Sequence, residues 1–456
     1  MNDNSVTMTR PAVLVFTCLV AAGTLTPRAQ GVDRAALAGR VKQEFLHAWS
    51  GYKEYAWRHD ELKPLSKTAY DWDPGKPLLM TPVDALDTMI LMKLDDEAER
   101  ARREIIEHLD VRQDTSVSVF EITIRLLGSL LANHQLTHDQ ALLDKARSLG
   151  DALLPAFSTR TGMPYRFVNL KTGATRDVIS NPAEIGTLIL EFGTLSKLTD
   201  NPVYYDTAKR ALTTLYAHRS KIGLVGENIN VETGEWTNPD SHVGGAIDSY
   251  YEYLLKCNRL FGDAECGDMW RSSVAAVNKH VADQVKGGLW YGTVDMNTGR
   301  RTATTFGSLQ AFFPAVLAMG GDIRRAQRLQ DSAYAMWTLH GIEPEEIDYS
   351  SMRVTAPGYQ LRPEIVESTY YLYHYTRDPR YLEMGQRMFD DLVKYCRTDT
   401  GYTVLESVVT KKQGDRMHSF LLAETFKYFY LLFEPDALDF DAVVFNTEAH
   451  PLRRVR

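Results

Sequence analysis

The sequence lacks three features that would place it in other classes of protein. After residue 30 no apolar run is long enough to span a bilayer, which excludes a protein with several membrane spans. Lysine and arginine do not gather among aromatic residues, and the formal net charge is −8, so we expect no nucleic-acid partner. No linker rich in proline, glycine or serine divides the 456 residues, which favours one large domain.

Cysteine is also scarce, with four residues in the chain. Cys18 lies in the N-terminal apolar segment, which leaves Cys257, Cys266 and Cys396. Cys257 and Cys266 flank an expected turn between two helices, a placement that suits a disulfide in an exported protein. The sequence alone leaves open whether they are joined, and the spacing of the three does not match a zinc site.

The N-terminus has the pattern of a secretory signal. Arg10 precedes an apolar run at residues 11–25, and small and polar residues follow up to Gly31. We predict that residues 1–30 are a cleaved signal peptide and that residues 31–456 are a single domain, exported to the periplasm or the medium. An uncleaved membrane anchor is the alternative. After cleavage we expect no membrane association and a monomer.

From residue 34 onward, apolar residues recur at helical spacing in segment after segment. Helices are predicted at residues 36–52, 83–109, 117–136, 139–154, 182–199, 202–219, 244–261, 269–285, 306–319, 323–339, 363–376, 380–395 and 417–433. A polar residue recurs in the first helix of each pair, at steps of about 60 residues, which marks a repeat architecture. These recurring residues are Glu121, Glu184, Asp248, Ser308, Glu364 and Glu424.

Counting the predicted helical pairs and the unpaired final helix gives about seven units, which form either an open solenoid or a closed ring. The segments at residues 126–131 and 185–192 are apolar nearly all round, so these helices are expected to be buried on both sides. Burial on both sides favours a closed ring, which also brings the recurring carboxylates to one axial cavity. The predicted fold is therefore all-α, an (α/α)7 barrel.

A short hairpin is expected at the C-terminus. The apolar residues 440–445 indicate a strand, and residues 446–451 (NTEAHP) provide a turn. Thr447 offers a hydroxyl and a carbonyl oxygen, a pair of hard donors that suits Ca²⁺. A surface turn without a ligand is the alternative. In a closed ring, this hairpin would plug one end and bring Thr447 to the axis.

The carboxylates have the pattern that glycoside hydrolysis requires, namely two carboxyl groups on either side of the scissile bond. They lie among apolar residues rather than on charged faces, which favours function over structural ion pairs. The candidate acids are Glu121, Glu184, Asp248, Glu364, Glu367 and Glu424. Arg125 and Arg362 lie close to two of them, and each either clamps sugar hydroxyls or holds a carboxylate. Phe420, one turn before Glu424, either stacks on a sugar ring or packs in the core.

Several stretches, in order along nearly the whole chain, resemble glycoside hydrolase family 47, the class I α-1,2-mannosidases. They are YAWRHDELKPLS (55–66), VDALDT (83–88), FEITIR (120–125), AEIGTLILEF (183–192), DSYYEYLLK (248–256), LRPEIVES (361–368), SFLLAET (419–425) and NTEAHP (446–451). The resemblance implies an (α/α)7 barrel plugged by a C-terminal β-hairpin. It also implies an exo-acting, inverting enzyme that uses Ca²⁺ to release terminal α-1,2-linked mannose from N-glycans.

Carried over by motif, the resemblance implies that Glu121 is the general acid, Glu364 the general base and Asp248 a third catalytic carboxylate. The family's acid role has been assigned to more than one of these positions, so the division between Glu121 and Asp248 stays open. Inversion requires about 6.5–9.5 Å between the two carboxyl groups, which leaves room for the attacking water.

The resemblance also implies a Ca²⁺ site. Thr447 would bind the ion through its carbonyl and hydroxyl oxygens. Waters held by Glu184, Glu367, Glu424 and Glu448 would complete the shell, together with two sugar hydroxyls.

Two positions depart from the family pattern. Ser308 stands where members usually have histidine, and His418 stands where they have glutamate. The signal is of bacterial style, so the natural substrate is either an N-glycan-type oligosaccharide or another α-mannoside. Two other readings compete: a lectin-like protein that binds mannose glycans without cleaving them, and a helical scaffold for protein partners. The intact carboxylates argue against the first, and their burial argues against the second.

Overall fold

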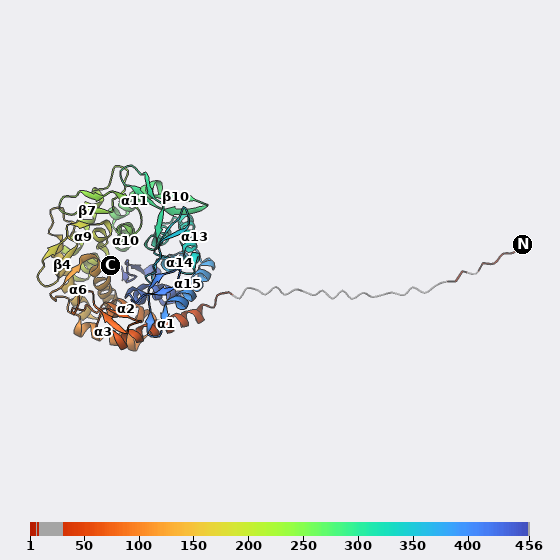
Figure 1. Cartoon of the computed structure of the whole chain (residues 1–456), viewed down its shortest axis with the longest axis horizontal. Helices are drawn as coiled ribbons and strands as arrows, with labels where there is room; N and C mark the ends of the chain where they lie inside the picture. Colours follow the sequence, from red (N-terminus) through yellow and green to blue (C-terminus); the bar gives the residue numbers. More distant parts are fainter. Residues whose placement is uncertain (6, 9–30, 455–456) are drawn as a thin grey trace. The chain divides into compact units, whose positions relative to one another are not determined.

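Helical hairpins arranged around a common axis make up the chain from Asp33 onward (Figure 1). The computed structural model describes residues 1–5, 7–8 and 31–454. Residues 6 and 9–30 of the predicted signal peptide lie outside the described residues, so the structure does not test that prediction. Within residues 31–454, no helix is both long enough and apolar enough to cross a membrane.

Seven inner helical segments surround the axis in the described part of the chain, residues 33–454. They are α2 (Met80–Leu91), α4 with η1 and α5 (Val119–Ile122, Thr123–Leu127, Gly128–Thr137), α7 with α8 (Pro182–Gly186, Ile189–Thr199), α10 (Asp248–Phe261), η3 with α12 (Ser308–Phe312, Phe313–Met319), α14 (Glu364–Thr376), and η4 with α16 (Leu421–Thr425, Phe426–Phe433). Every residue of α12 and α16 is buried, and so is nearly every residue of α2. Residues 126–131 and 185–192, which were expected to be buried on both sides, are buried throughout, so that expectation is confirmed.

An outer layer of amphipathic helices packs against the inner ring. It consists of α1 (Arg34–Tyr55), α3 (Asp95–His108), α6 (Gln140–Leu153), α9 (Val203–Ala217), α11 (Ala264–His280), α13 (Ile323–His340) and α15 (Arg380–Cys396). Each outer helix from α3 to α15 packs against the inner segment that precedes it. The predicted (α/α)7 barrel is therefore confirmed.

The ring closes between the first and the last of its helices. Phe45 of α1 and Phe426 of α16 lie with ring centroids 6.3 Å apart. The Arg34 Nε donates to the carbonyl of Phe433 at 3.2 Å. The prediction of a single helix at residues 83–109 was wrong. Residues 83–109 are themselves a hairpin, α2 and α3, because the chain turns at Lys93, whose φ is +54°.

Short antiparallel strands connect the helical pairs. Their sheets are β1–β2 (Glu61–Lys63, Thr68–Tyr70), β3–β4–β5 (Ser116–Ser118, Phe167–Asn169, Thr175–Arg176), β6–β7–β8 (Ile179–Ser180, Asn228–Asn230, Trp236–Asn238), β13–β12–β9 (Arg301–Ala303, Thr293–Asp295, Asp240–Ser241), β10–β11 (Ala282–Val285, Gly288–Tyr291), β14–β15–β16 (Thr305–Gly307, Glu346–Asp348, Arg353–Ala356), β17–β18 (Arg397–Thr398, Gly401–Tyr402) and β19–β20 (Leu405–Ser407, Lys412–Gln413). The three-stranded sheets join loops of successive helical pairs, so they link neighbouring units of the ring.

The predicted C-terminal hairpin is confirmed and lies inside the ring. Strand β21 (Val443–Phe445) pairs antiparallel with β22 (Pro451–Arg453), with Val444 opposite Leu452. The hairpin packs against α5 and α10. Residues 440–442 were expected to be strand but form a 3₁₀ turn, η6 (Phe440–Ala442), because the Asp439 side chain accepts from the amide of Asp441.

One disulfide ties an inner helix to its outer partner. Cys257 of α10 and Cys266 of α11 are joined, with their Cα atoms 6.0 Å apart, as their placement had suggested. Cys396 is free and buried, so it is left over as expected.

Candidate active site

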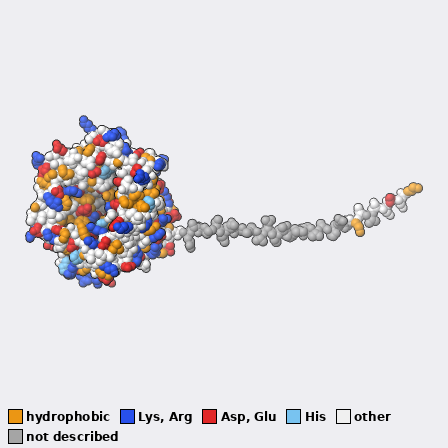
Figure 2. Space-filling model, in the orientation of Figure 1, with side chains coloured by type: hydrophobic (Ala, Val, Ile, Leu, Met, Phe, Trp, Pro, Cys, Tyr) orange, Lys and Arg blue, Asp and Glu red, His pale blue; other side chains and the backbone are white. Residues whose placement is uncertain are grey.

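A cavity of about 400 Å³ lies on the axis of the ring, above the turn of the C-terminal hairpin. Figure 2 shows a hollow near the centre of this face, with acidic and basic side chains at its edge. All the predicted site residues line the cavity: Glu121, Arg125, Glu184, Asp248, Arg362, Glu364, Glu367, Phe420, Glu424, Thr447 and Glu448. The structure thus brings together residues that are up to 327 positions apart in the sequence (448 − 121).

Four of the acids lie at the N-terminal ends of inner helices. Asp248 is the first residue of α10 and Glu364 the first residue of α14. Glu121 and Glu184 lie in the first turns of α4 and α7, where the side chains of Ser118 and Asn181 accept from their amides at 3.3 and 2.9 Å. Helix N-termini carry partial positive charge, which stabilises carboxylates gathered at one end of the barrel.

Arg125 holds two carboxylates in place. Its Nε donates to Glu121 Oε2 at 2.9 Å, and its Nη2 lies 2.8 Å from Glu448 Oε1. The guanidinium also lies over the rings of Trp72 and Phe420, at 5.5 and 5.7 Å from their centroids. These contacts match one of the two roles that the sequence left open for Arg125, that of holding a carboxylate.

Arg362 is held beside Glu364 by an acid that sequence reasoning missed. Its Nη2 and Nε lie 2.9 and 3.2 Å from the two oxygens of Glu345, while its Nη1 lies 3.9 Å from Glu364 Oε1. Burial raises the pKa of Glu364 to about 7, against the opposing effect of the Arg362 guanidinium. Glu345 lies in a loop and not at the recurring position of an inner helix, so the spacing of acids in the sequence did not indicate it.

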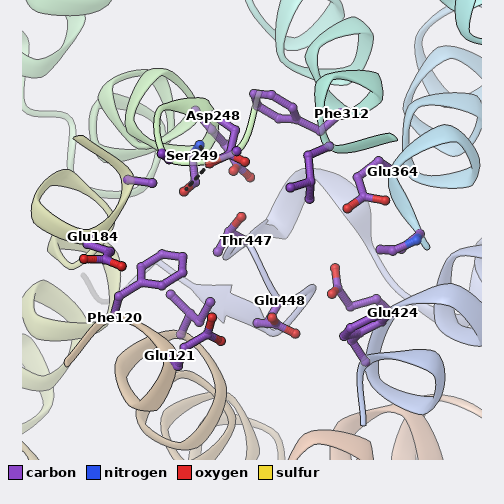
Figure 3. Close-up of a pocket in the computed structure, with 18 of the residues that line it drawn as sticks. Phe120, Glu121, Glu184, Asp248, Ser249, Phe312, Glu364, Glu424, Thr447 and Glu448 are labelled. Atoms are coloured by element: carbon purple, nitrogen blue, oxygen red, sulfur yellow. Dashed lines mark hydrogen bonds between the residues drawn. The ribbon is translucent and has the colours of Figure 1, made fainter. Parts of the chain in front are cut away.

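Asp248 lies beside Ser249 and Glu252. Its Oδ1 accepts from the amide of Ser249 at 2.8 Å (Figure 3). Burial raises its pKa to about 7, and the carboxylate of Glu252 adds to the rise. Glu252 also lines the cavity and was not predicted as a site residue. Its place one turn after Asp248 was a signal that should have found it.

Glu367, Glu424 and Glu448 line the same cavity as Thr447; Figure 3 shows the last two of these glutamates with Thr447. Burial raises the pKa of Glu367 to about 8 and that of Glu448 to about 7. The pKa of Glu424 lies well above its usual value through burial and the neighbouring Glu448. Buried carboxyl groups that line one cavity together with a threonine hydroxyl and carbonyl are donors of the kind that a hard divalent cation prefers.

Orphaned oxygens support the same fit. Glu364 Oε2 and Glu448 Oε2 are buried and have no hydrogen-bond partner among the described residues. A buried charged oxygen without a partner costs free energy, and a cation with its bound waters would supply that partner.

Glu184 is set apart from this group. Arg166 Nε lies 2.9 and 2.8 Å from its two oxygens, and the Ser180 hydroxyl donates to it at 3.0 Å. In Figure 3 it lies at the edge of the group, on the far side of Phe120 from Thr447. Arg166 was missed, because it comes from a loop and pairs with Glu184 only in the folded chain.

The two departures from the family pattern lie behind the cavity wall. The Ser308 hydroxyl donates to Glu345 Oε2 at 3.3 Å. His418 stacks on Phe420 with ring centroids 5.0 Å apart, and its Nε2 lies 3.2 Å from Gln360 Oε1. Ser308 therefore contacts the acid that holds Arg362, and His418 contacts Phe420. Neither residue belongs to the carboxyl groups that line the cavity.

An (α/α)7 ring that gathers carboxyl groups around a pocket is the architecture of a glycoside hydrolase, and the chain is an enzyme of this class. More specifically, residues 44–454 match the model of glycosyl hydrolase family 47, and the chain belongs to that family.

Curated relatives and a solved structure agree with this assignment. The chain is 39% identical over 457 residues to alpha-mannosidase I MNS4 of Arabidopsis thaliana, covering 94% of this chain and 72% of the relative. It is 36% identical to mannosyl-oligosaccharide 1,2-alpha-mannosidase IB of Homo sapiens, covering 91% of this chain and 69% of the relative. The structure of the alpha-1,2-mannosidase from Trichoderma reesei superposes with a TM-score of 0.85 at 29% identity, covering 93% of this chain and 100% of that one.

Proposed function

We propose that this glycoside hydrolase is an exo-acting, inverting α-1,2-mannosidase that depends on Ca²⁺. Its substrates are N-glycan-type oligosaccharides or other α-mannosides that end in α-1,2-linked mannose. The observation that carries the proposal is the axial cavity, which is lined by carboxyl groups and closed below by the turn that bears Thr447. The names of the human relative and of the Trichoderma reesei enzyme support the linkage.

A cavity with a closed floor suits exo-action. The C-terminal hairpin fills the ring beneath Thr447, so a sugar chain enters only from the open face and only by its end. The aromatic ring of Phe420 lies at the wall, where it is placed to pack against a sugar face. Arg362 lies between that ring and Glu364, with its guanidinium 5.9 Å from the Phe420 centroid.

The carboxyl groups divide into an acid and a base. Glu364 takes a proton from water as the water oxygen bonds to C1 of mannose, and the C1–O bond to the leaving group breaks. Glu121 gives its proton to the leaving oxygen, with Asp248 as the other candidate for this step. Arg362 favours the ionised form of Glu364 that a base requires. The product is β-mannose, because attack comes from the face opposite the leaving group.

Ca²⁺ has a place among these residues. The carbonyl and hydroxyl oxygens of Thr447 would hold it, with Glu367, Glu424 and Glu448 orienting its waters, and Glu184 further out against Arg166. When bound, the ion selects the axial 2-hydroxyl of mannose and favours a distorted ring. The proposal is supported by the carboxyl groups that line the cavity with Thr447 and by the unpartnered oxygens of Glu364 and Glu448.

Proton NMR of α-1,2-mannobiose with the purified protein tests the proposal. We expect β-mannose in the first minutes with Ca²⁺ and none with EGTA. Early α-mannose would overturn inversion, and release that continues in EGTA would overturn the metal dependence. Mannobiose that binds in a titration but is not cleaved would favour the lectin-like alternative.

Export and oligomeric state are part of the proposal as well. We propose that residues 1–30 are removed on export and that the mature enzyme is a monomer. N-terminal sequencing of the exported protein and light scattering of the purified protein check these two points.

A further inference from the structure

The turn of the C-terminal hairpin, residues 446–450, is held by polar side chains from five inner segments. Asn446 Nδ2 donates to the Ile124 carbonyl and to Glu191 Oε1, both at 2.8 Å, and the Thr447 amide donates to Tyr253 Oη at 3.2 Å. Glu448 Oε1 lies 2.8 Å from Arg125 Nη2. The Ala449 carbonyl accepts from Lys427 Nζ at 2.6 Å, and His450 Nδ1 lies 2.7 Å from Asp87 Oδ2. These contacts come from η1, α8, α10, α16 and α2. The turn is therefore in contact with five of the inner helical elements of the ring.

Lys427 has a special place in this set. Its side chain and that of Asp87 are both fully buried, and its Nζ lies 2.8 Å from Asp87 Oδ1. The same ammonium donates to the Ala449 carbonyl, and the same carboxylate binds His450. One buried ion pair thus fixes two consecutive residues of the turn, Ala449 and His450, to α16 and α2.

One residue of the turn has a backbone conformation that requires support from its surroundings. Ala449 has a φ of +59°, a left-handed conformation that its Cβ disfavours and that glycine would adopt more readily. The conformation persists because the surrounding contacts hold it. It directs the Ala449 carbonyl to Lys427 and leaves Thr447, two residues earlier, at the floor of the cavity.

Lys427 does not line the cavity, and its role differs from that of Glu424, one turn earlier, which does. We infer that Lys427, together with Asp87, is a positioning residue that presents the carbonyl and hydroxyl of Thr447 to a bound cation. The inference rests on the proposed function for the identity of the cation. It assigns a role to an ion pair that touches neither the substrate nor the metal.

The test removes the ion pair as a unit, because a single substitution would leave a buried charge without a partner. In the double variant Lys427→Met/Asp87→Asn, the asparagine oxygen still accepts from His450, while the bond to the Ala449 carbonyl is lost. The matched control is Lys53→Met/Glu97→Gln, which deletes the ion pair between α1 and α3 in the outer layer, 2.5 Å between Nζ and Oε1.

Calorimetric titration with Ca²⁺, at a temperature where circular dichroism shows all proteins folded, gives the first readout. We expect the double variant to bind Ca²⁺ about 10- to 100-fold more weakly, as is typical when a residue that supports a metal ligand is lost. We expect the control to match the native protein. At saturating Ca²⁺ the kcat of the double variant should recover. Native affinity in the double variant would overturn the inference and leave the pair a merely structural role.

Hydrogen exchange provides a readout that needs no metal. With EDTA present, the peptide that covers residues 443–454 should exchange faster in the double variant than in the control, because the amides of the turn lose their fixed geometry. Equal exchange would overturn the inference. If the native protein binds no Ca²⁺, the proposed metal dependence fails, and the exchange result alone decides the role of Lys427.

Discussion

The stability of the metal-free enzyme should fall as the pH rises from 5 to 8, because folding buries carboxyl groups that then hold their protons. Burial raises the pKa of Glu364 from its usual 4.5 to about 7, and that of Asp248 from 3.8 to about 7. The folded chain binds these protons more tightly than the unfolded chain does. Their stabilising contribution is therefore complete below the unfolded pKa values, near pH 4, and is lost as the pH rises through 7.

The magnitude follows from the shift at a single group. Moving the pKa of Glu364 from 4.5 to about 7 corresponds to about 3 kcal/mol, and each such group removes up to about 1.4 kcal/mol per pH unit in this interval. Glutamine resembles the protonated acid but does not titrate. Relative to the native protein, Glu364→Gln should gain about 2–3 kcal/mol in free energy of unfolding between pH 5 and pH 8.

Urea denaturation in EDTA at pH 5, 6, 7 and 8 measures this difference. Glu107→Gln serves as a control, because its side chain is 65% exposed, and its curve should run parallel to that of the native protein. If the Glu364→Gln curve also runs parallel, the carboxyl group does not hold its proton on folding and the reasoning is refuted. With Ca²⁺, the native protein should lose less stability with pH, since metal binding requires ionised groups and grows stronger as they lose protons.

Three further outcomes are expected. Glu364→Gln should slow hydrolysis of mannobiose by about 10²–10⁴-fold while mannoside binding in a calorimetric titration is retained; full activity would remove Glu364 as the base. Of Glu121→Gln and Asp248→Asn, the one that removes the proton donor should retain activity on α-mannosyl fluoride, whose leaving group needs no proton; equal losses on both substrates would contradict a general acid at either position. Gly51→Ala should lower the free energy of unfolding by about 1–3 kcal/mol in thermal denaturation, because the new methyl group overlaps the Thr400 carbonyl oxygen; a native melting temperature would contradict this close approach.

The inner ring and its acids could be predicted from the sequence because both leave local patterns. Helices buried on both sides are apolar all round, and an acid recurs near the start of most of them, as with Glu121 and Glu364. The turn at residues 446–451 was visible for the same reason. Each of these features depends on residues within one or two helical turns of each other.

The parts that could not be predicted are contacts between distant segments. The pairing of α1 with α16 closes the ring, yet no pattern in the sequence of either helix indicates the other as its partner. Arg166 and Glu345 face Glu184 and Arg362 only after the loops have folded, so no spacing in the sequence reveals them. The break at Lys93 depends on a left-handed residue that is not glycine, which the pattern of apolar residues does not encode.

The contact between α1 and α16 has a consequence for synthesis of the protein. Arg34 and Phe433, which meet at the closure of the ring, are 399 positions apart. During translation, α1 emerges early with Phe45 on the face that α16 will cover. This part of α1 lacks its inner partner until the last helix has been made, so the nascent chain exposes apolar surface there for nearly the whole of its synthesis.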